Sequence, residues 1–322
     1  MTSKAVPVLA GDIGGTKTRL ALFNAEGTQL ESLAEHTYPS QEHASLDEII
    51  ADFISSRDIR PNAACFGIAG PVRSNKSKAT NLPWHINAAA IARRFHIRQV
   101  SLLNDLEATA WGIRALNEAD FTVLNTGTGD NAGNAAIIAA GTGLGEAGLY
   151  RDTTLHRPFA TEGGHTAFSP GNELEIALLR FLLERYEHVS WERLLSGPGL
   201  VNIHAFLSRH HGHDSPGWLQ EEMRSGDPAA AVSRAAQAGR DTVCVEALVL
   251  FVHLYGVEAG NLALKLMATG GVYIGGGIAP KILEPLQTGA FMAGFCAKGR
   301  MRPLLEKMPV RVILNDRTAL YG

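Results

Sequence analysis

Residues 101–107 read Ser-Leu-Leu-Asn-Asp-Leu-Glu, and this stretch joins a strand pattern to a helix pattern. The apolar run 100–103 is typical of a buried strand, and residues 106–116 carry apolar side chains at helical spacing. Asn104 and Asp105 therefore stand at a strand-to-helix junction, where the helix N-terminus favours an ionised carboxylate. Both residues are also common helix caps, so capping alone explains the pair unless other motifs join it.

The composition is that of a globular protein long enough for two domains, with 322 residues, 45% hydrophobic and 19% charged. The 29 basic residues nearly balance the 32 acidic ones, so no net field draws the chain to nucleic acid or to an anionic membrane. Three scattered cysteines in apolar contexts predict buried thiols in a reducing cytosol. The first ten residues lack the apolar run of a signal peptide, and the most apolar stretch, 243–255, is too short to span a bilayer. We therefore expect a soluble, cytoplasmic protein without a nucleic-acid or membrane partner.

A glycine-rich turn joins two strand patterns near the start of the chain. Residues 6–10 and 18–23 predict strands, and residues 11–17 between them read Gly-Asp-Ile-Gly-Gly-Thr-Lys. Exposed N–H groups in such a turn can hold phosphate oxygens, and Asp12 could hold a magnesium ion through its waters. The turn is not a Walker P-loop, because Thr16 stands where a glycine is needed and a strand follows instead of a helix. A hairpin turn without a ligand explains these residues about equally well.

The same design recurs roughly 130 residues later, which suggests an internal duplication. Strand patterns at 135–140 and 146–150 flank the turn 141–145, which reads Gly-Thr-Gly-Leu-Gly. The two hairpins predict two related halves that face each other across a cleft. Residues 143–148 also match the dinucleotide pattern G-x-G-x-x-G, but strand-like residues follow where a helix should open, so a NAD site is disfavoured.

Further polar residues stand at predicted turns and helix starts. Glu162 and His165 flank a glycine pair, and Glu192 precedes a Ser-Gly-Pro-Gly segment. Individually, each is more typical of a surface or capping residue than of a ligand contact. Together with Asn104 and Asp105 they form a set rich in hydrogen-bond acceptors, which suits a ligand covered in hydroxyls.

Three other segments need an interpretation. Asn81 follows a polar loop, and turn formation explains it nearly as well as a ligand contact does. The three glycines 275–277 follow a predicted strand and let a flat ring such as adenine lie against the backbone. His210, His211 and His213 are expected in a polar loop without a partner at a telling distance, so we expect them to be solvated and not metal-bound.

Taken in order, these motifs resemble bacterial glucokinases, the hexokinase-like group of the actin-like sugar kinases. The related ROK sugar kinases carry a cysteine-rich zinc motif after their histidine, and this sequence has nothing like it. The resemblance implies an α/β, actin-like (ribonuclease H-like) duplicated fold with two domains around a central cleft. Residues 1–115, completed by 308–322, would form a small α/β domain, and residues 116–307 a large one. The motifs that carry the resemblance are residues 12–16, 103–105, 141–145, 162–165, 192–199 and 275–278.

The resemblance also implies transfer of the γ-phosphoryl group of ATP to the 6-hydroxyl of glucose, giving glucose 6-phosphate and ADP and feeding glycolysis. Asp105 would be the catalytic base, Asp12 would position Mg²⁺ through water, and the protein would be a homodimer. The implied sugar ligands are Asn81, Asn104, Asp105, Glu162, His165 and Glu192. The implied nucleotide-binding residues are Gly11, Asp12, Ile13, Gly14, Gly15, Thr16, Gly141, Thr142, Gly143, Gly276 and Gly277.

Three other functions fit parts of the sequence. A kinase for another hexose, such as mannose, glucosamine or fructose, would use many of the same contacts. A non-catalytic sugar-sensing regulator is disfavoured, because Asp12, Asp105 and both glycine turns are intact and no basic DNA-binding segment precedes the fold. An NAD oxidoreductase rests only on the glycine match. The motifs leave the phosphoryl donor open among ATP, ADP and polyphosphate.

Overall fold

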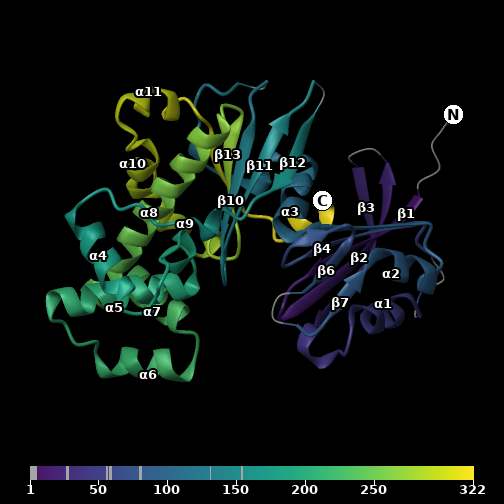
Figure 1. Ribbon diagram of the computed structural model, residues 1–322, viewed down its shortest axis with the longest axis horizontal. Helices are drawn as coiled ribbons and strands as arrows, with labels where there is room; N and C mark the ends of the chain where they lie inside the picture. Colours follow the sequence, from purple (N-terminus) through teal and green to yellow (C-terminus); the bar gives the residue numbers. More distant parts are fainter. Residues whose placement is uncertain are drawn as a thin grey trace. The chain divides into compact units, whose positions relative to one another are not determined.

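The computed structural model of the chain divides into two compact units, each built on its own β-sheet (Figure 1). The structure describes residues 6–26, 29–55, 57, 60–79, 82–130, 132–153 and 155–322. Unit 1 comprises Met1–Asp120 together with Asn315–Gly322, and unit 2 is Phe121–Leu314. The expected small domain took its second segment from residue 308, whereas unit 1 takes it from residue 315. The difference arises because strand β14 (Val310–Ile313) pairs into the sheet of unit 2.

Unit 1 contains a five-stranded sheet in the order β3-β2-β1-β4-β8. The first three strands are antiparallel, and β4 and β8 run parallel to β1. Alternate side chains face opposite sides of this sheet, so Leu20 and Leu22 pack with α1 and α2 while Ala21 and Phe23 pack with α12. The strands are β1 (Val6–Ile13), β2 (Lys17–Glu26), β3 (Gln29–Pro39), β4 (Ala63–Ile68) and β8 (Gln99–Asn104). The helices are α1 (Leu46–Ser55), α2 (Ala88–Phe95), α3 (Asp105–Gly112) and α12 (Thr318–Tyr321), and a small sheet consists of β5 (Val72–Arg73), β6 (Lys76–Lys78) and β7 (His85–Asn87).

Unit 2 repeats the strand order of unit 1. Its sheet runs β12-β11-β10-β13-β14-β9, in which β12, β11 and β10 are antiparallel and β13 and β14 run parallel to β10. Only the antiparallel edge strand β9 has no counterpart among the described strands of the first sheet. The predicted duplication and the α/β fold class are therefore confirmed. The strands are β9 (Phe121–Asn125), β10 (Ala135–Ala140), β11 (Leu144–Arg151), β12 (His156–Ala160) and β13 (Gly271–Gly275), in addition to β14.

Helix α8 (Thr242–Leu266) forms the centre of unit 2 (Figure 1). The prediction that the apolar stretch is too short to span a bilayer was wrong, because the helix has 25 residues and is by length and composition alone long and apolar enough. Within its most apolar window, however, 72% of the residues are buried inside the protein, as in the core helix of a globular domain. The other helices of the unit are α4 (Glu173–Leu183), α5 (Gly197–His211), α6 (Gly217–Ser225), α7 (Pro228–Gln237), α9 (Leu283–Gln287), α10 (Ala290–Cys296) and α11 (Arg302–Leu305).

Both glycine turns are shorter than predicted. Strand β1 extends to Ile13, and residues 14–16 make the turn, so Gly11, Asp12 and Ile13 are strand residues and not turn residues. The prediction failed because β1 is a central strand, hydrogen-bonded to β2 on one side and to β4 on the other. In unit 2 the turn is 141–143, because β11 already begins at Leu144.

The phenol of Tyr255 ties α8 to the strand ends that carry the second turn. It accepts a hydrogen bond from the Ala140 N–H at 3.1 Å and lies 3.3 Å from the carbonyl oxygen of Ile138. Because the ring is fully buried, Tyr255→Phe should leave the Ala140 N–H unpaired and lower the free energy of unfolding by about 1–3 kcal/mol. Urea denaturation would measure the loss, with Tyr150→Phe, at a 58% exposed tyrosine, as the matched control. Equal stabilities of the two variants would contradict this role.

Candidate active site

Asn104 and Asp105 occupy the predicted junction, where strand β8 ends and helix α3 begins. The Asn104 side-chain oxygen accepts from the backbone N–H groups of Leu106 and Glu107, so Asn104 is the N-cap of α3. Its amide nitrogen donates to the Gly70 carbonyl oxygen at 3.3 Å. Within the described residues, these bonds leave one amide hydrogen of Asn104 for a ligand. Capping is therefore the main structural role of Asn104, and Asp105 is the first residue of the helix.

The register of the parallel strands brings Asp12 and Asp105 to the same edge of the unit 1 sheet. Ile13, Ile68 and Asn104 are directly aligned on β1, β4 and β8. The carboxyl ends of parallel strands are where an open α/β sheet places its ligands. Asp12 comes one residue before this aligned row, and Asp105 one residue after it.

Gly67 lets α3 begin close against strand β4. A Cβ atom at Gly67 would lie 2.9 Å from the Ala108 Cβ and 3.7 Å from the Asp105 Cα. It would also lie 3.8 Å from the carbonyl oxygen of Gly11, the residue before Asp12. The absent side chain therefore places the backbone of Asp105 beside the strand that carries Asp12.

The carboxyl group of Asp12 is in an environment that a cation would stabilise. Burial raises its pKa, the positive charge of Arg19 lowers it, and the negative charge of Asp316 raises it again. Arg19 is itself paired with Asp316 at 3.0 Å, so its charge is shared. A carboxylate in such surroundings fits a hydrated Mg²⁺, which prefers oxygen ligands and keeps several of its waters.

Ser40 holds the first glycine turn from behind. Its hydroxyl donates to the Gly14 carbonyl oxygen at 2.8 Å and is hydrogen-bonded to the Thr18 hydroxyl at 2.9 Å. Its backbone N–H donates to the Thr16 carbonyl oxygen. Ser40 and Thr18 are fully buried, so the turn is fixed by bonds inside the unit while Thr16 is exposed. No local pattern indicates this role of Ser40, because Ser40 lies more than twenty residues after the turn that it supports.

Three segments of unit 2 meet at the second glycine turn. The Gly141 N–H bonds across the turn to the Gly143 carbonyl oxygen at 2.8 Å, and the Gly141 carbonyl oxygen accepts from Gly197, the first residue of α5. The turn after β13 also lies here, because a Cβ at Gly276 would be 2.3 Å from the Ala140 carbonyl oxygen. Gly276 has φ +83°, in the left-handed region that favours glycine. The predicted turns 141–143 and 276–277 are thus brought together.

The N-terminus of α5 was not recognised from the sequence. Ser196 is its N-cap: the hydroxyl accepts from the Gly199 N–H and donates to the Glu192 carbonyl oxygen. A helix N-terminus next to a glycine turn is favourable for phosphate. The sequence does contain a helix-start pattern, a serine cap followed by a proline in the first helical turn. The two glycines in the same turn obscure this pattern, because glycine is unfavourable in a helix.

Glu192 connects the second turn to the predicted sugar ligand His165. One carboxylate oxygen accepts from the Leu144 N–H at 3.1 Å, and the other lies 4.0 Å from the His165 Nδ1. Glu162 is exposed and immediately precedes the short 3-10 helix η4 (Gly163–His165). Unit 2 therefore gathers Glu162, His165 and Glu192 near one turn. Asn81 lies outside the described residues.

Two buried glutamates, Glu146 and Glu258, lie next to this cluster. The Glu146 carboxylate lies directly under η4, because a Cβ at Gly163 would be only 1.9 Å from the Glu146 Oε2. Burial and, to a smaller extent, the negative charge of the neighbouring Glu258 together raise the pKa of Glu146 to about 8. Burial raises the pKa of Glu258 as well, while Lys265, with its Nζ 3.7 Å from Glu258 Oε1, acts in the opposite direction. Neither glutamate was among the predicted residues.

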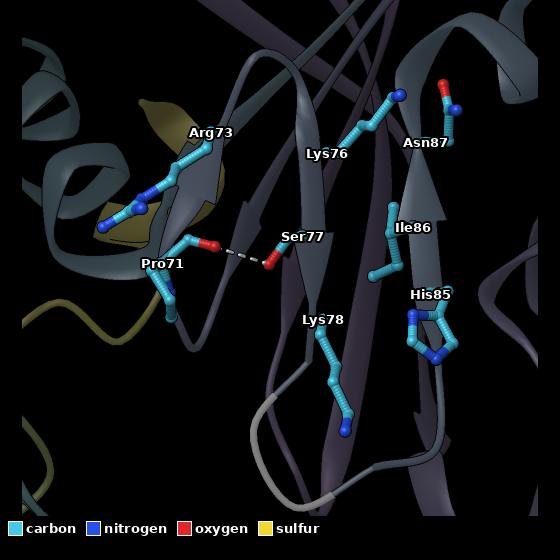
Figure 2. Close-up of a pocket in the computed structure, with 8 residues that line it drawn as sticks. All are labelled: Pro71, Arg73, Lys76, Ser77, Lys78, His85, Ile86 and Asn87. Atoms are coloured by element: carbon cyan, nitrogen blue, oxygen red, sulfur yellow. Dashed lines mark hydrogen bonds between the residues drawn. The ribbon is translucent and has the colours of Figure 1, made fainter.

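A separate hollow of about 390 Å³ lies on the small sheet of unit 1. Figure 2 shows the residues that line it, among them the basic side chains of Arg73, Lys76 and Lys78. The Ser77 hydroxyl donates to the Pro71 carbonyl oxygen at 3.0 Å, which fixes the segment after Gly70. The predicted site residues that the structure describes do not line this hollow. The connection between this sheet and the site is the preceding residue, Gly70, whose carbonyl oxygen accepts a hydrogen bond from Asn104.

Comparisons with known proteins cover nearly the whole chain. A family model described as Glucokinase matches residues 9–322. The chain is 43% identical to a glucokinase of a Nostoc species, covering 98% of this chain and 97% of the relative. It is 41% identical to a Synechocystis glucokinase, covering 100% and 98%. A crystal structure of glucokinase from an Antarctic psychrotroph matches with a TM-score of 0.87 at 32% identity, covering 98% and 97%. A ROK family glucokinase from Streptomyces griseus, in complex with glucose and AMPPNP, shares the fold at a TM-score of 0.65 and 20% identity over 98% and 97%.

The buried acid pair predicts a pH-dependent stability. The folded state keeps a proton on Glu146 up to about pH 8, whereas the unfolded chain loses it near pH 4.5, so this group's contribution to stability falls as the pH rises through that window. Glu146→Gln should therefore gain stability relative to the parent chain between pH 5 and pH 8.5, by at least about 1.4 kcal/mol, the value of one pKa unit. Urea titrations at both pH values measure this difference, and Glu284→Gln, at an exposed glutamate of unit 2, should show no such gain. A pH-independent difference for Glu146→Gln would contradict the buried proton.

Proposed function

Since this chain belongs to the glucokinase family and phosphorylates glucose with ATP, we propose that Asp105 is the base that takes the proton from the sugar 6-hydroxyl. The observation that carries this proposal is the strand edge of unit 1, which presents Asp105 at the start of α3 and Asp12 on β1. The 6-oxygen then bonds to the γ-phosphorus, the bond from that phosphorus to the bridging oxygen breaks, and ADP leaves with the electron pair.

A carboxylate of ordinary strength is sufficient for this step. The transition state of phosphoryl transfer is loose, so the hydroxyl becomes acidic only late and catalysis depends mainly on positioning and charge neutralisation. A positioned general base typically contributes about 10²–10⁴-fold. The cap at Asn104 and the close contact at Gly67 hold the backbone of Asp105 in place, which supports the positioning that this mechanism needs.

We assign the phosphate contacts to the glycine turns of both units. The turn 14–16 of unit 1 is held by Ser40, and the turn 141–143 of unit 2 lies at the N-terminus of α5. A bound Mg²⁺ would neutralise charge on the phosphates, and Asp12 would hold it through water. Gly276 and Gly277 would lie beside the adenosine, because a Cβ at Gly277 would meet open space. Gly11 and Ile13 contribute through the strand that carries Asp12.

We assign the sugar contacts to acceptors of both units. Glu192, His165 and Glu162 would bind sugar hydroxyls from unit 2, and Asn104 would use its remaining amide hydrogen. Asn81 stays a proposed ligand on the basis of the sequence alone. A buried acceptor matched to a hydroxyl disfavours analogues that lack it, because the acceptor is then left unpaired. Other hexoses that share some of the hydroxyls of glucose, such as mannose, glucosamine and fructose, are the alternative substrates, and their kcat/KM values relative to glucose decide between them.

We also propose that the protein acts in the cytoplasm, in glycolysis, and as a homodimer. The family membership and the three free cysteines, two of them buried, support an intracellular enzyme. Sedimentation equilibrium would test the dimer, and a monomer across the working concentration range would exclude it.

Asp105→Asn should lower kcat at least about 10²-fold and leave glucose binding within a few-fold, because the amide keeps the shape of the carboxylate and cannot accept the proton. A coupled assay for ADP gives kcat, and calorimetry gives glucose binding. Glu107→Gln is the matched control on the first turn of the same helix. If the two variants turned over equally fast, Asp105 would not be the base.

Glu192→Gln should raise the KM for glucose roughly 10- to 100-fold with a smaller change in kcat, because a charged acceptor to a hydroxyl contributes about 1.5–3 kcal/mol. The glutamine oxygen can still accept from Leu144 N–H, so the turn should keep its shape. Steady-state kinetics at saturating ATP measure this effect. The control Glu187→Gln, at an exposed glutamate nearby in the sequence, should leave the KM for glucose unchanged. An unchanged KM would remove Glu192 from the sugar site.

A further inference from the structure

Four side chains that could bind a metal ion lie together in unit 2, outside the residues assigned to glucose and ATP. His204 belongs to α5, Asp241 is the N-cap of α8, and Cys244 lies in the first turn of α8. One ligand atom from each of these three residues lies within 4.8 Å of the others, and all three residues are buried. His213, from the loop after α5, places its Nε2 3.0 Å from the Asp241 Oδ2.

The expectation that His210, His211 and His213 have no partner was wrong for His213, although its side chain stays 35% exposed. The expected loop was wrong for His210 and His211, which belong to α5. The partner of His213, Asp241, is 28 residues away in the sequence and becomes a neighbour only when α8 packs beside α5. His211 has a partner on α8 as well, with its Nε2 2.9 Å from the Glu246 carboxylate. No spacing rule along the chain identifies such pairs.

The imidazole of His204 is the strongest evidence for a metal site in this group of residues. The residue is 3% exposed, and its Nε2 is buried without a hydrogen-bond partner among the described residues. One helical turn later, the Ser208 hydroxyl is also buried and has no partner in the described part of the chain. An unsatisfied buried polar group costs about 1–3 kcal/mol, so a natural fold usually provides a partner. One ring nitrogen of His204 lies within 4.8 Å of a ligand atom of Asp241 and of Cys244, and carboxylate and thiol groups are donors that bind metal ions.

We propose that His204, Asp241 and Cys244, with His213 as the fourth ligand, bind one structural zinc ion. Two imidazole nitrogens, one thiolate and one carboxylate oxygen match the donors and the coordination number of structural zinc sites. Bonds of about 2.0–2.3 Å in a tetrahedral site separate the donor atoms by roughly 3.3–3.8 Å. The observed limit of 4.8 Å applies to the ligand atoms of His204, Asp241 and Cys244, which therefore need side-chain shifts of about 1 Å. The His213 Nε2 lies 3.0 Å from the Asp241 Oδ2, closer than two donors of one zinc ion, so His213 must exchange this contact for the metal.

The charges and the access route agree with zinc at this position. One thiolate and one carboxylate together neutralise a divalent ion, and the thiol proton passes to solvent as the metal binds. An open cavity of about 750 Å³, lined by His204, Ser208 and His213 among others, offers a path for the ion. Zinc binds the thiolate and not the thiol, so its affinity should fall at acidic pH.

The site would join two elements that matter for the proposed function. Helix α5 begins at the turn 141–143, and α8 carries Tyr255, which holds the strand ends at Ala140. A metal cross-link between α5 and the start of α8 would fix the second phosphate turn without touching substrate. We therefore expect removal of the zinc ion to lower Tm clearly and to change kcat only slightly.

Cobalt provides the direct test, because a cobalt–thiolate bond has its own near-ultraviolet charge-transfer absorption. The untagged chain, stripped with a chelator, should bind one Co²⁺ with this absorption and with visible bands of tetrahedral intensity. One equivalent of Zn²⁺ should abolish both and raise Tm. A titration of the native chain with no thiolate band and no zinc-dependent gain in Tm would overturn the proposal, and a water would then be the partner of His204.

Two variants assign the ligands. Cys244→Ser should abolish the charge-transfer band, and Cys296→Ser, at the other buried cysteine of unit 2, should keep it. His204→Gln should weaken zinc binding at least tenfold and remove the gain in Tm. A charge-transfer band that survives Cys244→Ser or disappears with Cys296→Ser would overturn the ligand assignment. If a variant fails to fold, the titration of the native chain still decides whether the metal site exists.

Discussion

Close contact between backbone segments at glycine is the constraint on which both halves of the proposed site depend. In unit 1, a side chain at Gly67 would meet Ala108 at 2.9 Å and force α3 away from β4, moving Asp105. In unit 2, a side chain at Gly276 would meet the Ala140 carbonyl oxygen at 2.3 Å and separate the turn after β13 from the turn after β10. The important groups are thus positioned by main-chain packing at strand ends, which is far stiffer than a long side chain.

A buried layer behind each turn fixes it before any ligand arrives. Ser40 bonds to both ends of the turn in unit 1, and Tyr255 bonds to the strand end next to the turn in unit 2. Ser196 links the start of α5 to Glu192. Donors that are already in place need no reorganisation when charge develops on a phosphoryl group. The buried pair of Glu146 and Glu258 belongs to the same layer and packs against η4. The raised pKa of Glu146 means that this pair lowers the free energy of unfolding as the pH rises toward 8.

The sequence predicted what local patterns encode, and it missed what depends on distant partners. Both hairpins, the strand-to-helix junction at Asn104 and the internal duplication were predictable, because alternation and glycine turns are local signals. The extent of β1 was not predicted, because its pairing with β4 comes from residues about fifty positions away. The start of α5 was not recognised, and the contact of His213 with Asp241 depends on two helices packing together. The order of the motifs indicated the function, whereas the supporting residues Ser40, Glu146 and Tyr255 became evident only in three dimensions.

Backbone amide exchange tests the central claim most directly. Hydrogen–deuterium exchange followed by mass spectrometry can report on the segments 14–17 and 141–144 with and without a non-hydrolysable ATP analogue in the presence of glucose. If the N–H groups of both turns bind the phosphates, exchange in both segments should slow when the nucleotide analogue is added. Unchanged exchange in both segments at a saturating concentration of the analogue would contradict the account.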